Sequence, residues 1–339
     1  MKRIAALLAL VCLLTGALGA SAFAAGPKYY KIGYCVNLKD RTLSDRFLEA
    51  FETYFLSLTT AEERFELFPL DAEGSAEKQR EQVDFMLEQG MDALIVQPVD
   101  LAQVEELVFT VAEKKVPLVL VSEKPLSYNT RKATINEKDQ RITAYENVCF
   151  VTADPKQAGM RQGQLISSLP HAGDLNGDGT MSFALIEGED RAAETQIRSL
   201  YSAQLLSMAV QHSKCLYTEA AGAGRGNSKE ICQNVLKRYK TNVDLILCNN
   251  DQLALGALAA IQEAGRVVGE DIFIIGADGD PQVIDLVRQG KISGTVAVNG
   301  QAMAQAAADA AVGMLHGEPQ DSFLLVDYIL VNQDNVNDL

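Results

Sequence analysis

The chain has 339 residues, and its 45 acidic residues outnumber its 30 basic ones, so its formal net charge at pH 7 is −15. A protein that reads the phosphate backbone of a nucleic acid needs clustered basic residues to displace counterions. The acidic balance therefore predicts no nucleic-acid partner. Two features count against a DNA-binding repressor: the acidic charge, and the absence of an N-terminal helix-turn-helix pattern from the sequence.

The first 24 residues have the three parts of a secretory signal peptide. Lys2 and Arg3 are charged, residues 4–14 form an apolar run, and Ala22-Phe23-Ala24 has the small residues of a cleavage site. The apolar run is too short to span a bilayer. We therefore predict an exported protein that is cleaved near Ala24.

Cleavage near Ala24 leaves 339 − 24 = 315 residues, which is enough for two domains of ordinary size. The loss of Lys2 and Arg3 changes the formal charge to −15 − 2 = −17. Processing as a lipoprotein at Cys12 is not expected, because Val11 before it is too bulky. We predict no lipid anchor.

Five cysteines remain in the mature chain, at positions 35, 149, 215, 232 and 248. Their spacings match no zinc motif, and an odd number cannot form a complete disulfide framework. Cys35, Cys149 and Cys248 lie in apolar, strand-like runs, which indicates buried small side chains. A bridge between Cys215 and Cys232 is an alternative that the sequence leaves open.

Strand-like runs rich in Val, Ile and Leu alternate with helix-length segments along the mature chain. The predicted strands are residues 30–36, 65–70, 93–97, 116–121, 148–152, 183–187, 216–219, 245–248 and 272–276. The predicted helices are residues 44–58, 76–88, 102–114, 157–169, 192–211, 228–239, 252–264 and 281–289. Continuous apolar strands between amphipathic helices are typical of parallel sheets that are covered on both faces. The predicted fold class is α/β.

The number of strands predicts two doubly wound sheets. Five strand–helix units precede Asp154 and about four follow before Gly276. The later apolar segments, residues 292–298 and 323–331, are then free to link the two lobes.

Ligands of doubly wound sheets bind outside the carboxyl ends of the strands. The side chains expected there are Asp40, Arg41, Ser122, Glu123, residues 190–198, Asn249, Asn250, Asp251, Asp278 and Asn299. This set is polar and contains no nucleophile beside a base. It indicates a recognition surface, and we predict that the protein is not an enzyme.

The most chemically specific stretch is Asp174–Ser182. Side chains that carry oxygen occupy alternate positions, namely Asp174, Asn176, Asp178, Thr180 and Ser182. Ca²⁺ prefers six to eight oxygens at about 2.3–2.6 Å, and this alternation points several inward. The twelfth position of an EF-hand loop falls on Leu185, where the motif needs a bidentate carboxylate. The stretch is either a metal site completed from elsewhere in the chain or a glycine-rich turn.

Several short motifs together carry a family resemblance. They are residues 149–154 (CFVTAD) running into Ala158-Gly159, the Asp174–Ser182 loop followed by residues 185–189 (LIEGE), Asn249-Asn250-Asp251, Gly276-Ala277-Asp278 and Gly294-Thr295-Val296. In their order and spacing they resemble the bacterial periplasmic sugar-binding proteins of the ribose/galactose type, most closely the glucose/galactose branch. The resemblance covers nearly the whole mature chain.

The resemblance implies two α/β lobes joined by three crossings that close on a sugar like a hinged clamp. It implies crossings near residues 152–154, 298–299 and 325–328. The N-terminal lobe would comprise residues 25–152 plus 299–325, and the C-terminal lobe residues 153–298 plus 326–339. It also implies an ABC permease as partner and, for some members of the family, a chemoreceptor. We expect a monomer.

The glucose/galactose branch binds Ca²⁺, with an extra carboxylate from a distant strand. The matching position here is Asp244, which would supply what Leu185 cannot. The resemblance therefore implies a structural Ca²⁺ held by Asp174, Asn176, Asp178, Thr180, Ser182 and Asp244. Asp244 is shorter than the family's glutamate and Ser182 is shorter than its glutamine, so weaker affinity is expected.

The sugar site is carried over in part. Arg198, Asn250 and Asp278 match ligand-binding residues of the family, and Glu194 takes the place of an aspartate. Such groups suit a sugar hydroxyl, which both donates and accepts hydrogen bonds. The predicted ligand-binding set is Asp40, Arg41, Ser122, Glu194, Arg198, Asn250, Asp278 and Asn299.

Other positions depart from the family's pattern. Arg41 replaces an aspartate, Ser122 an asparagine and Ala192 a histidine. Leu43 replaces one of the two aromatic residues that stack on the sugar, and residues 220–226 offer no aromatic for the other. The alternatives for the ligand are a glucose- or galactose-like sugar, another sugar, a sugar acid, or some other small polar molecule. Arg41 would pair with a carboxylate or phosphate of the ligand, although pairing with Asp40 or another nearby carboxylate of the protein is the alternative.

The sequence predicts the solute-binding component of an ABC importer, which binds a monosaccharide by closure of its lobes. The alternative is a sensor that presents its closed form to a membrane chemoreceptor or sensor kinase without feeding transport.

Overall fold

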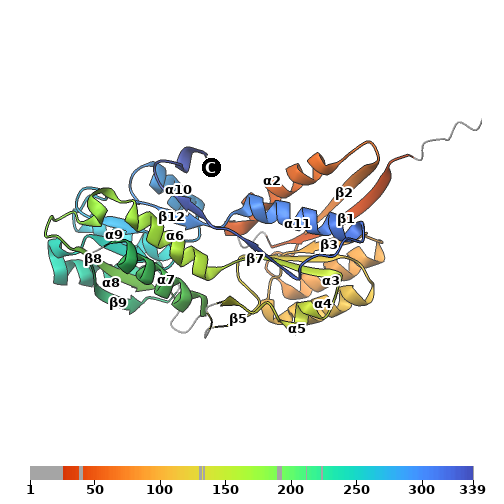
Figure 1. Cartoon of the computed structure of the whole chain (residues 1–339), viewed down its shortest axis with the longest axis horizontal. Coiled ribbons are helices and arrows are strands. Elements are labelled where there is room, and N and C mark those ends of the chain that lie inside the picture. The colour runs from red at the N-terminus through yellow and green to blue at the C-terminus, as the bar shows by residue number, and fades with distance from the viewer. Residues whose placement is uncertain are drawn as a thin grey trace, which may run out of the picture.

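The computed structural model describes residues 26–37, 41–129, 132, 134–188, 193–210, 212–222 and 224–338, without the side chains of residues 41–46 and Tyr128. In this part of the chain, two α/β lobes lie side by side and are joined by a narrow connection (Figure 1). The predicted signal peptide lies outside the described residues.

The N-terminal lobe is built on a six-stranded sheet of order β13-β7-β4-β3-β1-β2. All neighbouring strands in it run parallel. Its strands are β1 (Lys28–Val36), β2 (Glu63–Asp71), β3 (Ala93–Val96), β4 (Leu118–Ser122), β7 (Val148–Ala153) and β13 (Phe323–Val326). Every residue of β3 and β7 is buried, as expected for central strands covered on both faces.

Helices cover both faces of this sheet. On one face lie α2 (Arg41–Leu58) and α11 (Gly300–Leu315). On the other lie α3 (Ala76–Glu88), α4 (Val104–Glu113) and the short α5 (Gln140–Thr143), with the 3-10 turn η1 (Leu101–Gln103) leading into α4. Helix α11 is not among the predicted helices, because its many alanines give little hydrophobic periodicity. Ala304, Ala307 and Ala308 on α11 are nevertheless fully buried.

The C-terminal lobe has a four-stranded parallel sheet of order β11-β10-β8-β9. Its strands are β8 (Met181–Glu187), β9 (Ser213–Ala220), β10 (Leu245–Cys248) and β11 (Phe273–Ile275). Helices α6 (Pro155–Ser167) and α7 (Ala193–Ala209) lie on one side, and α8 (Arg225–Tyr239), α9 (Asp251–Glu263) and α10 (Pro281–Arg288) on the other. Short 3-10 turns occur at η2 (Pro170–Gly173), η3 (Lys240–Asn242) and η4 (Val336–Asp338).

Two short antiparallel pairs complete the architecture. Strand β12 (Thr295–Ala297) pairs with β14 (Ile329–Val331), and β5 (Tyr128–Asn129) pairs with β6 (Thr134–Ile135). The chain passes between the lobes after β7, between β12 and α11, and between β13 and β14. These three crossings confirm the predicted fold class of two parallel-sheet lobes with a three-stranded hinge. The predicted residue boundaries of the lobes stay predictions.

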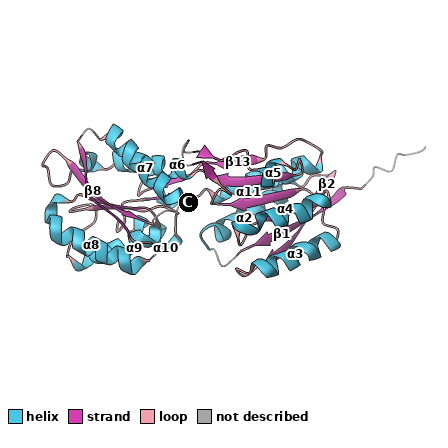
Figure 2. Cartoon of the chain, turned by 90° about the horizontal axis from the view of Figure 1, so that it is seen from below, coloured by secondary structure: helices cyan, strands magenta, loops and turns pink. Residues whose placement is uncertain are grey.

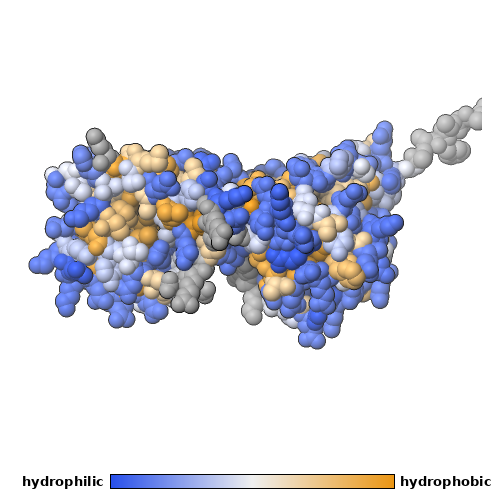
Figure 3. All heavy atoms as spheres, turned by 60° about the horizontal axis from the view of Figure 1, so that its bottom comes forward, coloured by the Kyte–Doolittle hydropathy of each residue, from blue (hydrophilic) through white to orange (hydrophobic). Residues whose placement is uncertain are grey.

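A second view, turned by 90°, also shows the two lobes as distinct units (Figure 2). Each keeps its own sheet between layers of helices (Figure 2). The space-filling view shows two rounded lobes with a narrow waist between them, and hydrophilic residues over much of both visible surfaces (Figure 3). None of the helices in the described ranges combines the length and apolar composition that a membrane crossing needs.

The cysteines in the described ranges are free thiols. Cys35, Cys149, Cys232 and Cys248 are buried, whereas Cys215 is exposed. Burial raises the pKa of the Cys35 thiol to about 11 and that of Cys149 to about 12. Cys215 and Cys232 are both free thiols, so the alternative of a bridge between them is not realised in this structure.

Candidate functional site

A cavity of about 250 Å³ lies between the lobes. The N-terminal lobe, the C-terminal lobe and the hinge all contribute to its walls. The lining residues are Glu123, Lys124, Pro125, Pro155, Gly188, Glu194, Thr195, Arg198, Asn249, Asn250, Asp278 and Tyr328. Pockets for drug-sized ligands enclose about 300–1,000 Å³, so this cavity suits a small solute.

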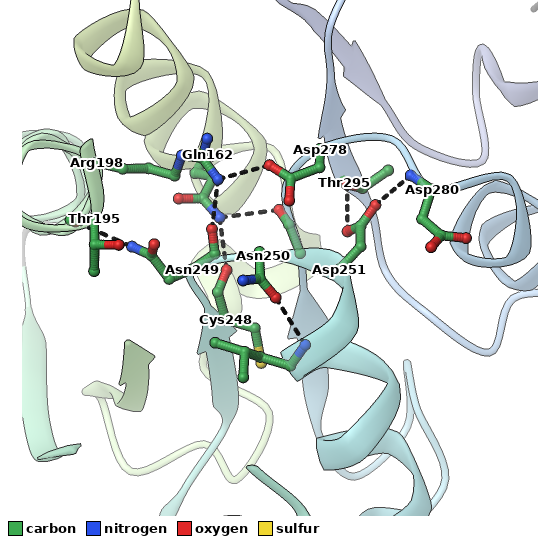
Figure 4. Close-up of polar contacts among 12 residues, drawn as sticks. Gln162, Thr195, Arg198, Cys248, Asn249, Asn250, Asp251, Asp278, Asp280 and Thr295 are labelled. Carbon is green, nitrogen blue, oxygen red and sulfur yellow. Dashed lines mark hydrogen bonds and ion pairs between the residues drawn. The ribbon is translucent and has the colours of Figure 1, made fainter. Parts of the chain in front are cut away.

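Arg198 on α7 is at the centre of the polar wall. Its Nη1 donates to Asp278 Oδ1 at 2.8 Å and to the Asn249 carbonyl at 2.7 Å (Figure 4). Its Nε is buried and has no hydrogen-bond partner among the residues that the structure describes. Asp278 and Asn249 therefore hold Arg198 through Nη1, while its Nε–H remains a donor.

Burial and charge act in opposite directions on this pair. Burial is the largest single effect and would lower the pKa of the Arg198 guanidinium, but Asp278 first, and then Tyr328 and Glu123, together outweigh it, and the pKa is raised. Burial raises the pKa of Asp278, while Arg198 and then Lys124 partly offset that rise. The charges on Arg198 and Asp278 balance one another at the wall of the cavity.

Two asparagines follow strand β10. Asn249 is buried and donates its Nδ2 to the Thr195 carbonyl at 3.2 Å and to Ser199 Oγ at 2.9 Å, which ties the β10 end to α7. Asn250 caps α9, because its Oδ1 accepts from Leu253 N at 2.9 Å. Its oxygen is committed to the helix, so its NH₂ group is what Asn250 offers to the cavity.

Asp251 holds the base of this wall together. Its Oδ1 accepts from Thr295 Oγ1 and its Oδ2 from Asp280 N, each at 2.7 Å (Figure 4). Gly276 leaves room for the carboxylate, since a Cβ there would stand 2.1 Å from Asp251 Oδ1. Burial, followed by the nearby Asp278, raises the pKa of Asp251 well above its ordinary value. One carboxylate thus joins α9, the start of α10 and the hinge strand β12.

The opposite wall comes from the end of β4 and from the hinge. Glu123 and Lys124 follow β4, and their charges act on Arg198 and Asp278, respectively, across the cavity. Tyr328 lies at the hinge and is buried, and its backbone N–H donates to Gln157 Oε1 on α6 at 2.5 Å. Tyr328 is the one aromatic residue among the described residues that line the cavity.

Four of the predicted ligand-binding residues line this cavity together, namely Glu194, Arg198, Asn250 and Asp278. Two others lie outside the described lining and make local hydrogen bonds. Ser122 Oγ accepts from Lys124 N at 3.2 Å, and Asn299 Oδ1 caps α11 by accepting from Ala302 N at 3.0 Å. Asp40 and the side chain of Arg41 fall outside the described residues.

Lys124 and Tyr328 line the cavity but are not in the predicted ligand-binding set. Lys124 lies two residues beyond the end of β4, so the strand-end rule alone could have indicated it. Tyr328 lies between β13 and β14, where the sequence signals a crossing but not which side chain faces the ligand.

The Asp174–Ser182 loop is closed by its own oxygens. Asp174 accepts from Gly177 N at 2.8 Å and from Gly179 N at 2.9 Å. Asn176 Oδ1 and Asp178 Oδ1 each accept at 2.9 Å from the backbone N–H two residues further on. Within the described ranges, no group of three or more His, Cys, Asp or Glu side chains is arranged to hold a metal ion.

Asp244, which is distant in the sequence, accepts hydrogen bonds from the backbone of this loop. Its Oδ2 accepts from Ser182 N at 2.8 Å, and its Oδ1 accepts from Leu175 N at 3.2 Å and Asn176 N at 3.3 Å. Burial raises the pKa of Asp244, and the charge of Asp174 contributes in the same direction. The predicted approach of Asp244 to the loop is therefore present, and in this structure its oxygens accept from backbone N–H groups of the loop. Calcium binding stays a prediction.

The fold and the cavity define a two-lobed protein with a small, polar-lined cavity between its lobes. The chain matches the model of the periplasmic binding protein domain over residues 41–319, and it belongs to that family.

Individual relatives share between 16% and 28% of their residues with this chain. The D-galactose/methyl-galactoside binding periplasmic protein MglB of Haemophilus influenzae is 28% identical over 79% of this chain and 80% of its own. The ribose import binding protein RbsB of Bacillus subtilis is 24% identical over 86% and 87%, respectively. The arabinose binding protein AraP of Geobacillus stearothermophilus has the same fold, with a TM-score of 0.70 and 16% identity over 92% of this chain and 99% of that one.

Proposed function

We propose that the protein is the solute-binding component of an ABC importer and that it binds a sugar or a related polyol between its lobes. The observation that carries the proposal is the cavity whose walls come from both lobes and the hinge. A ligand in that position contacts both lobes, so it favours the closed form by its greater affinity for it. The names of the relatives, which describe sugar binding and import, support the same role.

The electrostatics of the walls favour a neutral ligand. Arg198 is paired with Asp278, and the other charged residues in the described part of the lining, Glu123, Lys124 and Glu194, carry both signs. Amide, carboxylate and guanidinium groups together offer donors and acceptors to several hydroxyls. Tyr328, the single aromatic among the described lining residues, offers less ring stacking to a ligand than two aromatics would. This favours recognition by hydrogen bonds over stacking on a pyranose face.

We infer further that the protein is periplasmic and acts without catalysis. The family to which the chain belongs is that of periplasmic binding proteins, and the relatives are named as binding proteins. Signalling to a chemoreceptor gains no support from those names, and a monomeric state stays a prediction.

A thermal-shift screen of the mature protein tests the proposal. Its panel should contain aldopentoses, aldohexoses, cyclitols and sugar acids, because ligand binding to the native state raises its melting temperature. At least one neutral member is expected to shift the melting temperature, and titration calorimetry then gives its affinity. No shift with any member would contradict the proposal. A shift with sugar acids alone would contradict the neutral-ligand part.

A further inference from the structure

Gln162 is a polar residue in an apolar setting. It lies on α6, on the side that packs against the C-terminal sheet, and its side chain is fully buried. Leu165 and Ile166 on the same helix are buried with it. Glutamine is seldom buried unless it is hydrogen-bonded, so its contacts indicate what it does there.

The Gln162 side chain joins the ends of two strands. Its Nε2 donates to the carbonyl oxygens of Cys248 and Gly276, each at 2.9 Å (Figure 4). The backbone pairing of β10 with β11 stops at Leu247 and Ile275, one residue earlier. Gln162 therefore supplies the next link between the strands from a side chain.

The residues that follow this link form the wall of the cavity. Asn249 and Asn250 follow Cys248, and Asp278 follows Gly276 by two residues. Arg198 then joins the same two segments again, through the Asn249 carbonyl and Asp278 Oδ1. The gap between the β10 and β11 ends is thus fixed by Gln162 from behind and by Arg198 from the cavity.

Asp278 needs such support. Its φ is 109°, in a region that residues other than glycine rarely adopt. Conformations of this kind persist only where the surrounding structure holds them. The Asp278 N–H donates to the Val296 carbonyl at 2.7 Å, which fixes it from the hinge side, and the Gln162 link fixes the preceding backbone.

A purely stabilising role explains Gln162 less well. Its Oε1 is buried and has no partner among the described residues, which costs stability. An apolar side chain of similar volume would avoid that cost, but it would release the Cys248 and Gly276 carbonyls.

We propose that Gln162 is a positioning residue for the ligand, which sets the spacing between the Asn249–Asn250 segment and Asp278. This inference rests on the proposed function, because it assumes that the cavity binds the solute. Gln162 does not line the cavity, so its effect on affinity is indirect.

Two variants test the proposal, with affinity measured by calorimetry on the best sugar of the screen. Gln162→Met keeps the volume but removes both donors, and the affinity is expected to fall about tenfold or more, since two buried acceptors lose their partner. Gln162→Glu retains one donor only when protonated. Its affinity is expected to recover toward that of the wild type in mildly acidic solution, whereas that of Gln162→Met is not.

Two controls separate positioning from general damage. Gln164→Met changes an exposed glutamine on the same helix and should bind like the wild type. Asn147→Leu removes another amide-to-carbonyl bond, from Asn147 Nδ2 to Val116 O at 2.8 Å, at the amino end of the N-terminal sheet. It should lower the melting temperature and leave the affinity unchanged.

Hydrogen–deuterium exchange provides a readout without ligand. In Gln162→Met, peptides that cover residues 249–253 and 276–280 should exchange faster, while those from the N-terminal lobe should not. Wild-type affinity and unchanged exchange in both variants would overturn the inference. If the wild type binds no sugar, the proposed function fails, and the exchange data alone decide whether Gln162 positions these segments.

Discussion

Gly159 on α6 lies so close to Arg198 on α7 that a Cβ atom at position 159 would stand 2.4 Å from the Arg198 carbonyl oxygen. One turn further along α6, a Cβ at Gly163 would stand 2.7 Å from Leu205 Cβ. The two glycines therefore permit the close approach of α6 and α7. That approach determines how far the Arg198 side chain reaches toward Asp278.

Gly159→Ala is expected to separate the two helices and weaken ligand binding. Overpacking of this kind typically costs about 1–3 kcal/mol of the free energy of unfolding. Urea titration measures that loss and calorimetry the affinity. The matched control is Gly226→Ala on α8, where an added Cβ meets nothing within 4 Å. It should leave the affinity unchanged and leave stability unchanged or slightly raised, because alanine is the better helix former. Equal stability of the Gly159→Ala protein and the wild type would contradict the packing argument.

Asp278→Asn keeps the shape of the side chain but removes the charge that balances Arg198. Hydrogen bonds to charged groups contribute about 1.5–3 kcal/mol, so affinity for the sugar should fall by about tenfold to a hundredfold. Calorimetry at two salt concentrations measures the effect. Asp285→Asn is the control, because its pair with Arg288 is exposed and such pairs contribute about 0–1 kcal/mol. If both variants bound equally well, Asp278 would not belong to the binding wall.

The sequence predicts the architecture well where the chemistry is local. Apolar strands such as β7 and β10 are recognisable from their composition, and the polar residues after them meet at one edge because parallel strands end together. Helix α11 is missed because its alanines fill a narrow space on the sheet without a marked apolar stripe. Gln162 is missed for another reason. Its role depends on which strand ends meet behind the cavity, and spacing along the chain does not contain that information. Lys124, by contrast, lies just beyond the end of β4, where the strand-end rule could have indicated it.

Asp251 makes the stability of the protein depend on pH. Its pKa is raised well above the ordinary value of 3.8, chiefly by burial. The native state therefore binds more protons than the unfolded state between these two pKa values. The free energy of unfolding is expected to fall as the pH rises through that window. Asp244 and Asp278, whose pKa values are also raised, act in the same direction.

Asp251→Asn removes one of these ionisations. An asparagine can still accept from Asp280 N and can donate to Thr295 Oγ1, so the fold should be retained. Urea titrations over a pH series should show a shallower decline for the variant than for the wild type, and higher stability near neutral pH. Parallel curves for the two proteins would show that Asp251 does not titrate in this window.

Variants at Asp244 and Asp178 separate two roles of the Asp174–Ser182 loop, namely hydrogen bonding to the Asp244 carboxylate and binding of a metal ion. Asp244→Asn places a donor where the carboxylate accepts backbone N–H groups at both ends of the loop, so the free energy of unfolding should fall by about 1–3 kcal/mol without any metal. Asp178→Asn retains the acceptor for Thr180 N and should be nearly neutral in the same metal-free assay.

Calcium then separates the two variants from the wild type. If the predicted site binds Ca²⁺, the ion raises the melting temperature of the wild type, chelator reverses the rise, and both variants respond less. A melting temperature that is the same with Ca²⁺ and with chelator would refute the calcium prediction. The expected loss of stability in metal-free Asp244→Asn would still stand, because it depends only on the hydrogen bonds between the Asp244 carboxylate and the loop.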